Sequence, residues 1–144
     1  YINYFDYAFN FFTSFGYFAY DRDHMMAAKA FAAGLKKDGL LIVDYLNPDA
    51  IFKCLVPEST VTRGSYTFHI KKRLERNHII KEIAFVDADN KPRHYTESVA
   101  TFGLGDFERM FGAAKLSLIA TFGDYKLNAY DAATSPRMIM IFKK

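Results

Sequence analysis

The feature that most constrains the fold is a strand, helix and strand pattern within the first 46 residues. The apolar run Phe5–Phe11, interrupted only by Asp6, is typical of a strand buried on both faces of a parallel sheet. A helix ending near Gly34 follows. Its apolar positions repeat at helical spacing and are Met26, Ala27, Ala30, Phe31 and Leu35. Asp38-Gly39 is a turn signal, and Leu40–Val43 is a second apolar strand. Because a helix joins them, the two strands are expected to be parallel neighbours.

The middle of the chain has a different pattern. Residues 48–62 contain two prolines and are expected to be irregular. From Tyr66 to Thr101, apolar and polar side chains alternate in runs separated by turn signals at Asn77 and Asp89-Asn90. This pattern predicts an antiparallel meander, whose excess of Lys and Arg favours a solvated outer face over an anion site.

The end of the chain returns to the first pattern. The elements expected there are a helix over Leu104–Ala114 and strands over Leu116–Phe122 and Arg137–Phe142. We therefore predict one domain with an α/β fold. Its core comprises residues 1–47 and 102–144, and residues 60–101 form an inserted antiparallel β meander.

Composition narrows the possible partners and compartment. A formal net charge of +3 over 144 residues does not favour a nucleic-acid partner. No run approaches the roughly 18 apolar residues of a membrane span, and the single Cys54 has no partner for an internal disulfide. We expect a cytoplasmic protein that binds neither nucleic acid nor membrane. Because the chain opens at Tyr1 inside an aromatic run, we interpret it as a fragment.

Several segments resemble class I S-adenosylmethionine-dependent methyltransferases. Phe5–Asn10 with Thr13–Phe18 is similar to the fourth strand and its loop, and Ala33–Asn47 is similar to the next helix end and fifth strand. The last helix and two strands are similar to the family's ending, in which the seventh strand is antiparallel. The resemblance implies the second half of a Rossmann-like sheet, strands four to seven. The meander is similar to the insertion of small-molecule members, including amino-sugar N-methyltransferases.

The resemblance also implies a function. It covers nearly the whole chain but lacks the Gly-rich loop with which the family binds its cofactor. It implies that S-adenosylmethionine is the cofactor of the full-length protein, in which this chain supplies the substrate side for a small-molecule acceptor. The isolated chain is expected to be inactive and to bind the cofactor weakly.

The candidate site follows from the sheet, because ligands of open α/β sheets lie beyond the carboxyl ends of the parallel strands. The residues expected to bind the cofactor are Asn10, Phe11, Phe12 and Ser14. The residues expected to bind the substrate are Phe15, Tyr17, Tyr45, Asn47 and Tyr95. Tyr17, beside the sulfonium, and His94, as a proton acceptor, are the candidate catalytic residues. Core packing is an equally good interpretation of each ring, and the four histidines lack metal-ligand spacing.

A second interpretation comes from a different class of protein. A half-sheet would expose the edge of Phe5–Phe11, and exposed apolar edges pair with other chains. The isolated chain would then be a non-catalytic α/β module that forms a homodimer through this edge. A strand ending in a Gly-x-Gly loop upstream of Tyr1 would decide for the enzyme. A cone-shaped α+β binding fold is a further alternative, which the two apolar strands disfavour.

Overall fold

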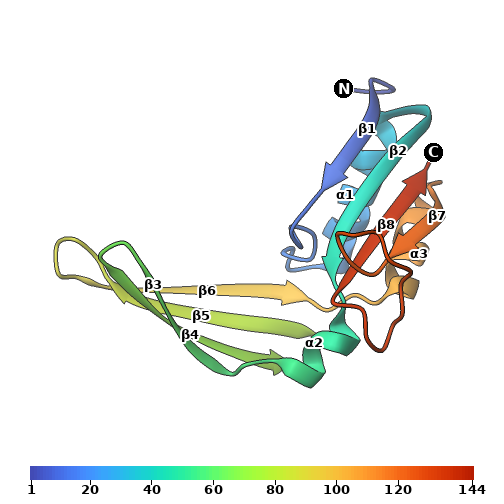
Figure 1. Ribbon diagram of the computed structural model, residues 1–144. Coiled ribbons are helices and arrows are strands. Elements are labelled where there is room, and N and C mark those ends of the chain that lie inside the picture. The colour runs from blue at the N-terminus through green and yellow to red at the C-terminus, as the bar shows by residue number, and fades with distance from the viewer. The chain divides into compact units, whose positions relative to one another are not determined.

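The computed structural model describes all 144 residues and shows a mixed α/β protein with two separate four-stranded sheets (Figure 1). The chain divides into two compact units. Unit 1 comprises Tyr1–Lys53 and Phe102–Lys144, and unit 2 comprises Cys54–Thr101. No helix is long and apolar enough to cross a membrane.

The sheet of unit 1 has the order β1-β2-β8-β7. Its strands are β1 (Phe5–Asn10), β2 (Leu35–Leu46), β7 (Ser117–Phe122) and β8 (Arg137–Lys143). β1 and β2 are parallel, with Phe9 opposite Ile42 and Asn10 opposite Val43. β8 is antiparallel to both β2 and β7. The prediction of a parallel pair joined by a helix is therefore confirmed, as is the antiparallel last strand.

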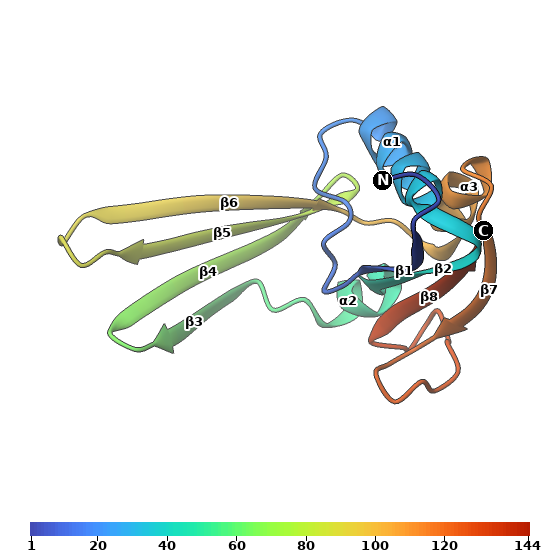
Figure 2. The ribbon, with the colours of Figure 1, turned by 90° about the horizontal axis from the view of Figure 1, so that it is seen from above.

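Helices α1 (Asp21–Gly34) and α3 (Leu104–Ala113) lie against the same face of this sheet (Figure 2). α2 (Pro48–Cys54) follows β2. The core lies between the two long helices and the sheet, and its largest fully buried side chains include Tyr45, Phe107, Phe111, Phe142, Leu41 and Met140. Burial of such side chains contributes roughly 1.5–3 kcal/mol each, so this layer holds unit 1 together.

Unit 2 is a single antiparallel sheet of order β3-β4-β5-β6. Its strands are β3 (Glu58–Arg63), β4 (Tyr66–Glu75), β5 (His78–Val86) and β6 (Pro92–Ala100). The predicted meander is confirmed from Tyr66 onward. The sheet has one more strand than expected, because residues 48–62 form α2 and β3 and are not irregular. Pro48 occupies the first position of α2, where proline is tolerated, so this proline starts an element.

The prediction that the first strand is buried on both faces is wrong. β1 is the edge of its sheet, and Phe5, Tyr7 and Phe9 are all exposed. In α1 the apolar positions noted for their helical spacing are not the most buried ones, apart from Leu35, which begins β2. The buried side chains of α1 are His24, Ala28 and Ala32, whereas Met26 is 66% exposed. Both faces of α1 carry apolar residues, so helical spacing alone cannot identify the one that packs on the sheet.

The turn expected at Asp38-Gly39 lies inside β2, which starts five residues earlier than predicted. Asp38 has φ +64°, and the pairing of β1 with β2 shifts register between Phe5 and Tyr7. The pair thus marks a bulge in a continuous strand. Residues with a left-handed backbone occur in β-bulges as well as in turns, which explains why Asp38-Gly39 was predicted to be a turn.

Candidate active site

A strained loop follows β1 at the carboxyl end of the parallel pair. Phe12 and Thr13 both have φ +59°, in the left-handed region that non-glycine residues rarely adopt, and Gly16 has φ +100°. Such backbone costs on the order of 1–3 kcal/mol per residue and persists only where the surroundings enforce it. Because two consecutive residues are affected, the loop must be held by contacts with other elements.

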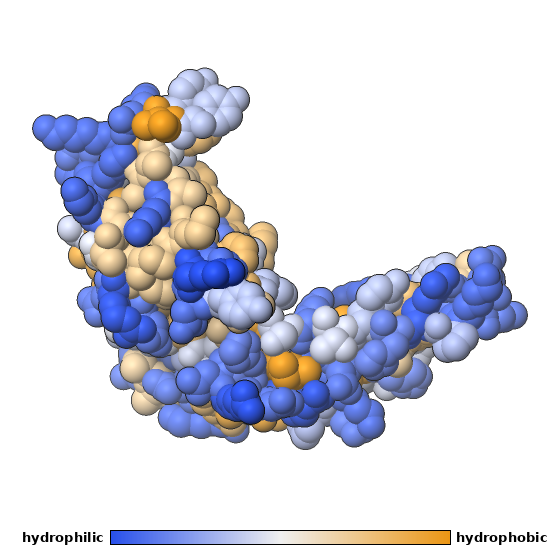
Figure 3. All heavy atoms as spheres, turned by 180° about the vertical axis from the view of Figure 1, so that it is seen from behind, coloured by the Kyte–Doolittle hydropathy of each residue, from blue (hydrophilic) through white to orange (hydrophobic).

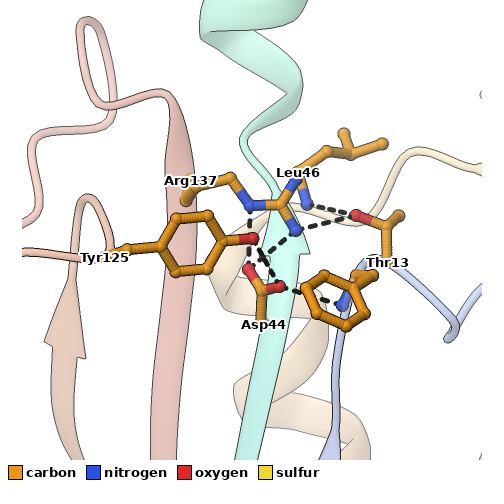
Figure 4. Close-up of polar contacts among 6 residues, drawn as sticks. Thr13, Asp44, Leu46, Tyr125 and Arg137 are labelled. Atoms are coloured by element: carbon orange, nitrogen blue, oxygen red, sulfur yellow. Dashed lines mark hydrogen bonds and ion pairs between the residues drawn. The ribbon is translucent and has the colours of Figure 1, made fainter.

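Asp44, near the end of β2, supplies the first of these contacts (Figure 4). Its carboxylate Oδ2 accepts hydrogen bonds from the Phe12 backbone N–H and the Tyr125 hydroxyl, each at 2.9 Å. Its Oδ1 accepts a hydrogen bond from Arg137 Nε at 2.8 Å and lies 2.7 Å from Arg137 Nη2. Asp44 is 1% exposed, so its charge is neutralised by one guanidinium and its oxygens are fully used.

Thr13 supplies the second set of contacts. Its Oγ1 accepts hydrogen bonds from the Leu46 backbone N–H and from Arg137 Nη2, both at 3.0 Å. Its backbone N–H donates to the Asp44 carbonyl oxygen at 3.0 Å. Arg137 therefore bridges the Asp44 carboxylate and the Thr13 hydroxyl, and the loop after β1 is fastened to both β2 and β8.

Tyr125 lies on the segment between β7 and β8 and completes the cluster. Partial burial, followed by its hydrogen bond to Asp44, raises the pKa of Tyr125. The Arg137 guanidinium lies 5.9 Å from the centre of its ring. Tyr125 thus stays protonated near neutral pH and acts as a donor to the carboxylate.

Of the residues expected to bind the cofactor, three are exposed on the loop. Phe11 and Phe12 are 43% and 79% exposed, and Ser14 is exposed with its backbone N–H bonded to the Phe11 carbonyl. The fourth, Asn10, has its side-chain Oδ1 buried without a hydrogen-bond partner. A buried acceptor without a donor costs about 1–3 kcal/mol, so its presence at the end of β1 indicates a site for a donor group.

Of the residues expected to bind the substrate, two lie in the core. Phe15 is 2% exposed, with ring centres of Phe107 and Phe111 at 5.5 and 5.7 Å. Tyr45 is fully buried against Phe107, and burial raises its pKa strongly. The packing interpretation describes both rings. By contrast, Tyr17 is 52% exposed directly after Gly16.

Asn47 is fully buried after β2 and fastens the segment before β8. Its Nδ2 donates to the carbonyl oxygens of Ala132 and Ser135 at 2.9 and 2.8 Å, and its Oδ1 accepts a hydrogen bond from the Tyr130 hydroxyl at 3.5 Å. The amide thereby sets the path of the chain into Arg137. Asn47, predicted to bind the substrate, therefore uses its side-chain amide to hold the segment before β8 in place.

His94 and Tyr95 belong to β6 in unit 2. His94 is exposed, and the ring of Tyr95 stacks on Phe85 with centres 6.0 Å apart. His94 and Tyr95 thus lie in unit 2. The structure places the other exposed or part-buried candidates at the end of β1 and on the loop that follows it in unit 1, namely Asn10, Phe11, Phe12, Ser14 and Tyr17.

The sequence interpretation missed the cluster of Thr13, Asp44, Tyr125 and Arg137. A signal was present, because Asp44 and Arg137 are opposite charges at the ends of two otherwise apolar strands. The antiparallel register of β2 and β8, in which Leu46 lies opposite Arg137, brings them together. No three His, Cys, Asp or Glu side chains gather as a metal site requires.

No protein-family model and no curated protein sequence matches this chain. Solved structures do match. An S-adenosylmethionine-dependent methyltransferase from Clostridium acetobutylicum has a TM-score of 0.82 at 17% identity, with 98% of this chain and 58% of that chain covered. A methyltransferase from Streptomyces caelestis has a TM-score of 0.78 at 13% identity, with coverages of 97% and 57%.

A sugar N-methyltransferase from Streptoalloteichus has a TM-score of 0.70 at 16% identity, with coverages of 99% and 57%. The chain thus spans somewhat more than half the length of the methyltransferases that it matches. At these identities the likeness concerns the fold. The chain therefore has a fold like that of the part of these methyltransferases that it covers.

Proposed function

We propose that this chain is the substrate-side part of a cytoplasmic class I S-adenosylmethionine-dependent methyltransferase that acts on a small molecule. The observation that carries the proposal is the match of 98% of the chain to such a methyltransferase at a TM-score of 0.82. Neighbours described as sugar or amino-pentose methyltransferases favour an amino sugar as the acceptor. In this proposal β1 and β2 correspond to the fourth and fifth strands of the complete sheet, and β7 and β8 to the sixth and seventh.

The residues at the carboxyl end of β1 fit the proposed cofactor. The buried Asn10 Oδ1 offers an acceptor for an amino or hydroxyl group. The exposed rings of Phe11 and Phe12 offer faces for adenine or for a cationic sulfonium. The Gly-rich loop of the family has no counterpart in these 144 residues, so the rest of the cofactor site belongs to the full-length protein.

When bound, S-adenosylmethionine supplies a methyl group that an acceptor lone pair takes from sulfur in an in-line displacement. Such a reaction is accelerated mainly by alignment and by exclusion of water. In this chain the loop after β1 aligns the reactants, and the half-exposed Tyr17 orients the acceptor. His94 accepts the proton that the acceptor loses, because an imidazole nitrogen can act as a general base.

Calorimetric titration with S-adenosylmethionine tests the cofactor claim. The full-length protein should bind with a dissociation constant in the micromolar range, and the 144-residue chain about a hundredfold more weakly, a difference of about 2.7 kcal/mol. Tight binding by the chain alone would show that the missing loop is dispensable. Absence of binding to both would overturn the function itself.

An activity assay tests the acceptor class. The full-length protein is incubated with methyl-labelled cofactor and with pairs of nucleotide-linked sugars that differ only by an amino or a hydroxyl group. We expect label on the amino member. Transfer to the hydroxyl member alone would exclude the amino-sugar acceptor while leaving the methyltransferase proposal intact.

A second function, self-association, is favoured by the exposed edge of unit 1. β1 has no neighbour on its outer side. An apolar hollow of about 430 Å³ lies beside it, where the rings of Tyr1, Phe5 and Phe31 meet Ala27 and Ala30 of α1. Figure 3 shows hydrophobic atoms gathered on this part of the molecule. Unpaired strand edges with apolar surroundings favour pairing with another chain, so we propose that the isolated chain forms a homodimer through β1.

Sedimentation of the chain at micromolar concentration tests this pairing. We expect a dimer that Phe9→Lys dissociates, because a charge on β1 opposes strand addition. Ile119→Lys is the matched control, since Ile119 is 54% exposed on β7, the other edge of the same sheet. A wild-type monomer, or equal dissociation by both variants, would contradict pairing through β1.

A further inference from the structure

We propose that Thr13, Asp44 and Arg137 act as positioning residues that hold the Phe11–Ser14 loop in its cofactor-binding conformation. The proposal rests on the proposed function. It assigns a role to three side chains that the interpretation of the sequence did not select.

The loop itself is the first argument. Phe12 combines a left-handed backbone at φ +59° with a side chain that is 79% exposed. Burial of the ring does not compensate for the backbone strain, because most of its surface remains exposed to water. Strained backbone is concentrated at active sites and ligand-binding segments, where the strain is part of the function. The benefit of the conformation therefore lies in presenting the ring and the adjacent Asn10 acceptor at the carboxyl edge of the sheet.

The contacts that hold the loop are the second argument. The Asp44 carboxylate takes the Phe12 N–H at 2.9 Å, the Asp44 carbonyl takes the Thr13 N–H at 3.0 Å, and the Thr13 hydroxyl takes Leu46 N–H at 3.0 Å. Arg137 binds both the Asp44 carboxylate and the Thr13 hydroxyl. Four of these five contacts join Phe12 or Thr13 to β2 or β8, so the loop cannot relax without breaking them.

Burial separates this role from catalysis. Asp44 is 1% exposed, and its oxygens accept from Phe12, Tyr125 and Arg137. All of its carboxylate contacts are therefore made with groups of this chain. Its effect on the reaction passes through the backbone of Phe12 and Thr13, which makes it a positioning residue.

The test uses position 13, where two substitutions separate the hydroxyl from the side-chain volume. Thr13→Val keeps the shape and removes the acceptor, whereas Thr13→Ser keeps the acceptor. Thr62→Val is the control, because the exposed hydroxyl of Thr62, on β3, is hydrogen-bonded only to the hydroxyl of Thr67 on β4. Hydrogen exchange of the peptide covering residues 10–17 and steady-state kinetics are measured on the full-length protein.

We expect Thr13→Val to raise the exchange rate of this peptide at least tenfold and to raise the KM for S-adenosylmethionine about tenfold, with kcat changed less than threefold. Thr13→Ser and Thr62→Val should stay within twofold of wild type in both measurements. Loop exchange and KM that are unchanged in Thr13→Val would overturn the proposal. So would exchange that rises equally throughout the protein, since that result indicates a general loss of stability.

If Thr13→Val does not fold, Tyr125→Phe takes its place, because it removes one hydrogen bond from the Asp44 carboxylate at an exposed position. It should raise exchange of the same peptide about threefold, and unchanged exchange would overturn the proposal. Failure of the proposed function gives a different result: no methyl transfer by the wild-type protein, with the exchange difference between Thr13→Val and Thr13→Ser still present.

Discussion

β1 and β2 are parallel neighbours that both contain apolar stretches but lie in opposite environments. Each contains an aspartate within an apolar stretch, Asp6 in β1 and Asp44 in β2, while Asp38, the second aspartate of β2, lies at its bulge. Asp6 forms an exposed ion pair with Lys36, whereas Asp44 is buried with Arg137. Phe9 of β1 is 56% exposed, whereas Leu41 of β2 is fully buried.

The difference comes from position in the sheet. β2 has β1 on one side and β8 on the other, and β1 has a neighbour on one side only. An apolar strand at an edge is unfavourable in water by itself, so it indicates a surface that another part of a protein covers. The hydrophobic pattern therefore identifies a strand, while the strand order decides whether its side chains are buried in this chain or exposed for a partner.

Replacing the two aspartates by alanine should give the largest difference in the free energy of unfolding. Asp44→Ala leaves Arg137 partly buried without its carboxylate and frees the loop, so we expect a loss of about 3–5 kcal/mol in the free energy of unfolding. Asp6→Ala should change it by less than about 1 kcal/mol, because exposed ion pairs contribute little. Urea denaturation of both variants measures these changes. Equal losses in the free energy of unfolding would show that the two aspartates contribute equally to stability.

Replacing Leu41 and Phe9 by alanine should give the second-largest difference in the free energy of unfolding. Leu41→Ala leaves a cavity in the core and should cost about 2–5 kcal/mol. Phe9→Ala should cost less than about 1 kcal/mol in a dilute monomer, because its ring is mostly in water. Urea denaturation at several protein concentrations separates a true edge effect from one that arises in a dimer. A loss above 2 kcal/mol for monomeric Phe9→Ala would mean that β1 is part of the core.

Local sequence patterns predicted the fold class, whereas features that depend on residues far apart in the sequence were missed. Periodicity and turn residues located α1, α3 and the strands from Tyr66 to Val86, because these elements depend on neighbours in sequence. The exposure of β1 depends on strand order, which no local pattern contains. The bulge at Asp38 was misread for a similar reason, since the left-handed residue is local but its pairing with β1 is not.

The candidate site divides in the same way. The rule that ligands lie beyond the carboxyl ends of parallel strands directed attention to the Asn10–Tyr17 loop, which the structure places there. It did not select Arg137, which lies 93 residues from Asp44 in sequence and meets it only through the antiparallel register of β8. Phe15 and Tyr45 were chosen as aromatic residues near that edge, and their burial follows from the packing of α3, especially Phe107.

The segment between β7 and β8 should contribute less stability in acid. Hydrogen bonds from Asn128 lower the pKa of Asp124, and hydrogen bonds from Thr134 and Ala133 lower that of Asp131, both from 3.8. A carboxylate with a lowered folded pKa adds stability above pH 3.8 and loses it as the pH falls further. We expect stability to decline below about pH 4, and less steeply in Asp124→Asn and Asp131→Asn. Thermal melts from pH 6 to 2.5 check this, with Asp6→Asn as the exposed control.

The smallest effect on stability is expected at Tyr17, where the loop after β1 meets the proposed reaction. Tyr17 is 52% exposed, so Tyr17→Phe should leave the melting temperature of the full-length protein within about 1 °C, as surface substitutions usually do. If its hydroxyl orients the acceptor, the same variant should lower kcat about tenfold or more with little change in the KM for the cofactor. Tyr17→Ala should also weaken binding, because the ring is lost. Unchanged turnover in Tyr17→Phe would show that the hydroxyl takes no part in the mechanism. If the only effect is a lower melting temperature in Tyr17→Ala, the ring of Tyr17 contributes to packing, like the buried side chains of β2 and unlike the exposed ones of β1.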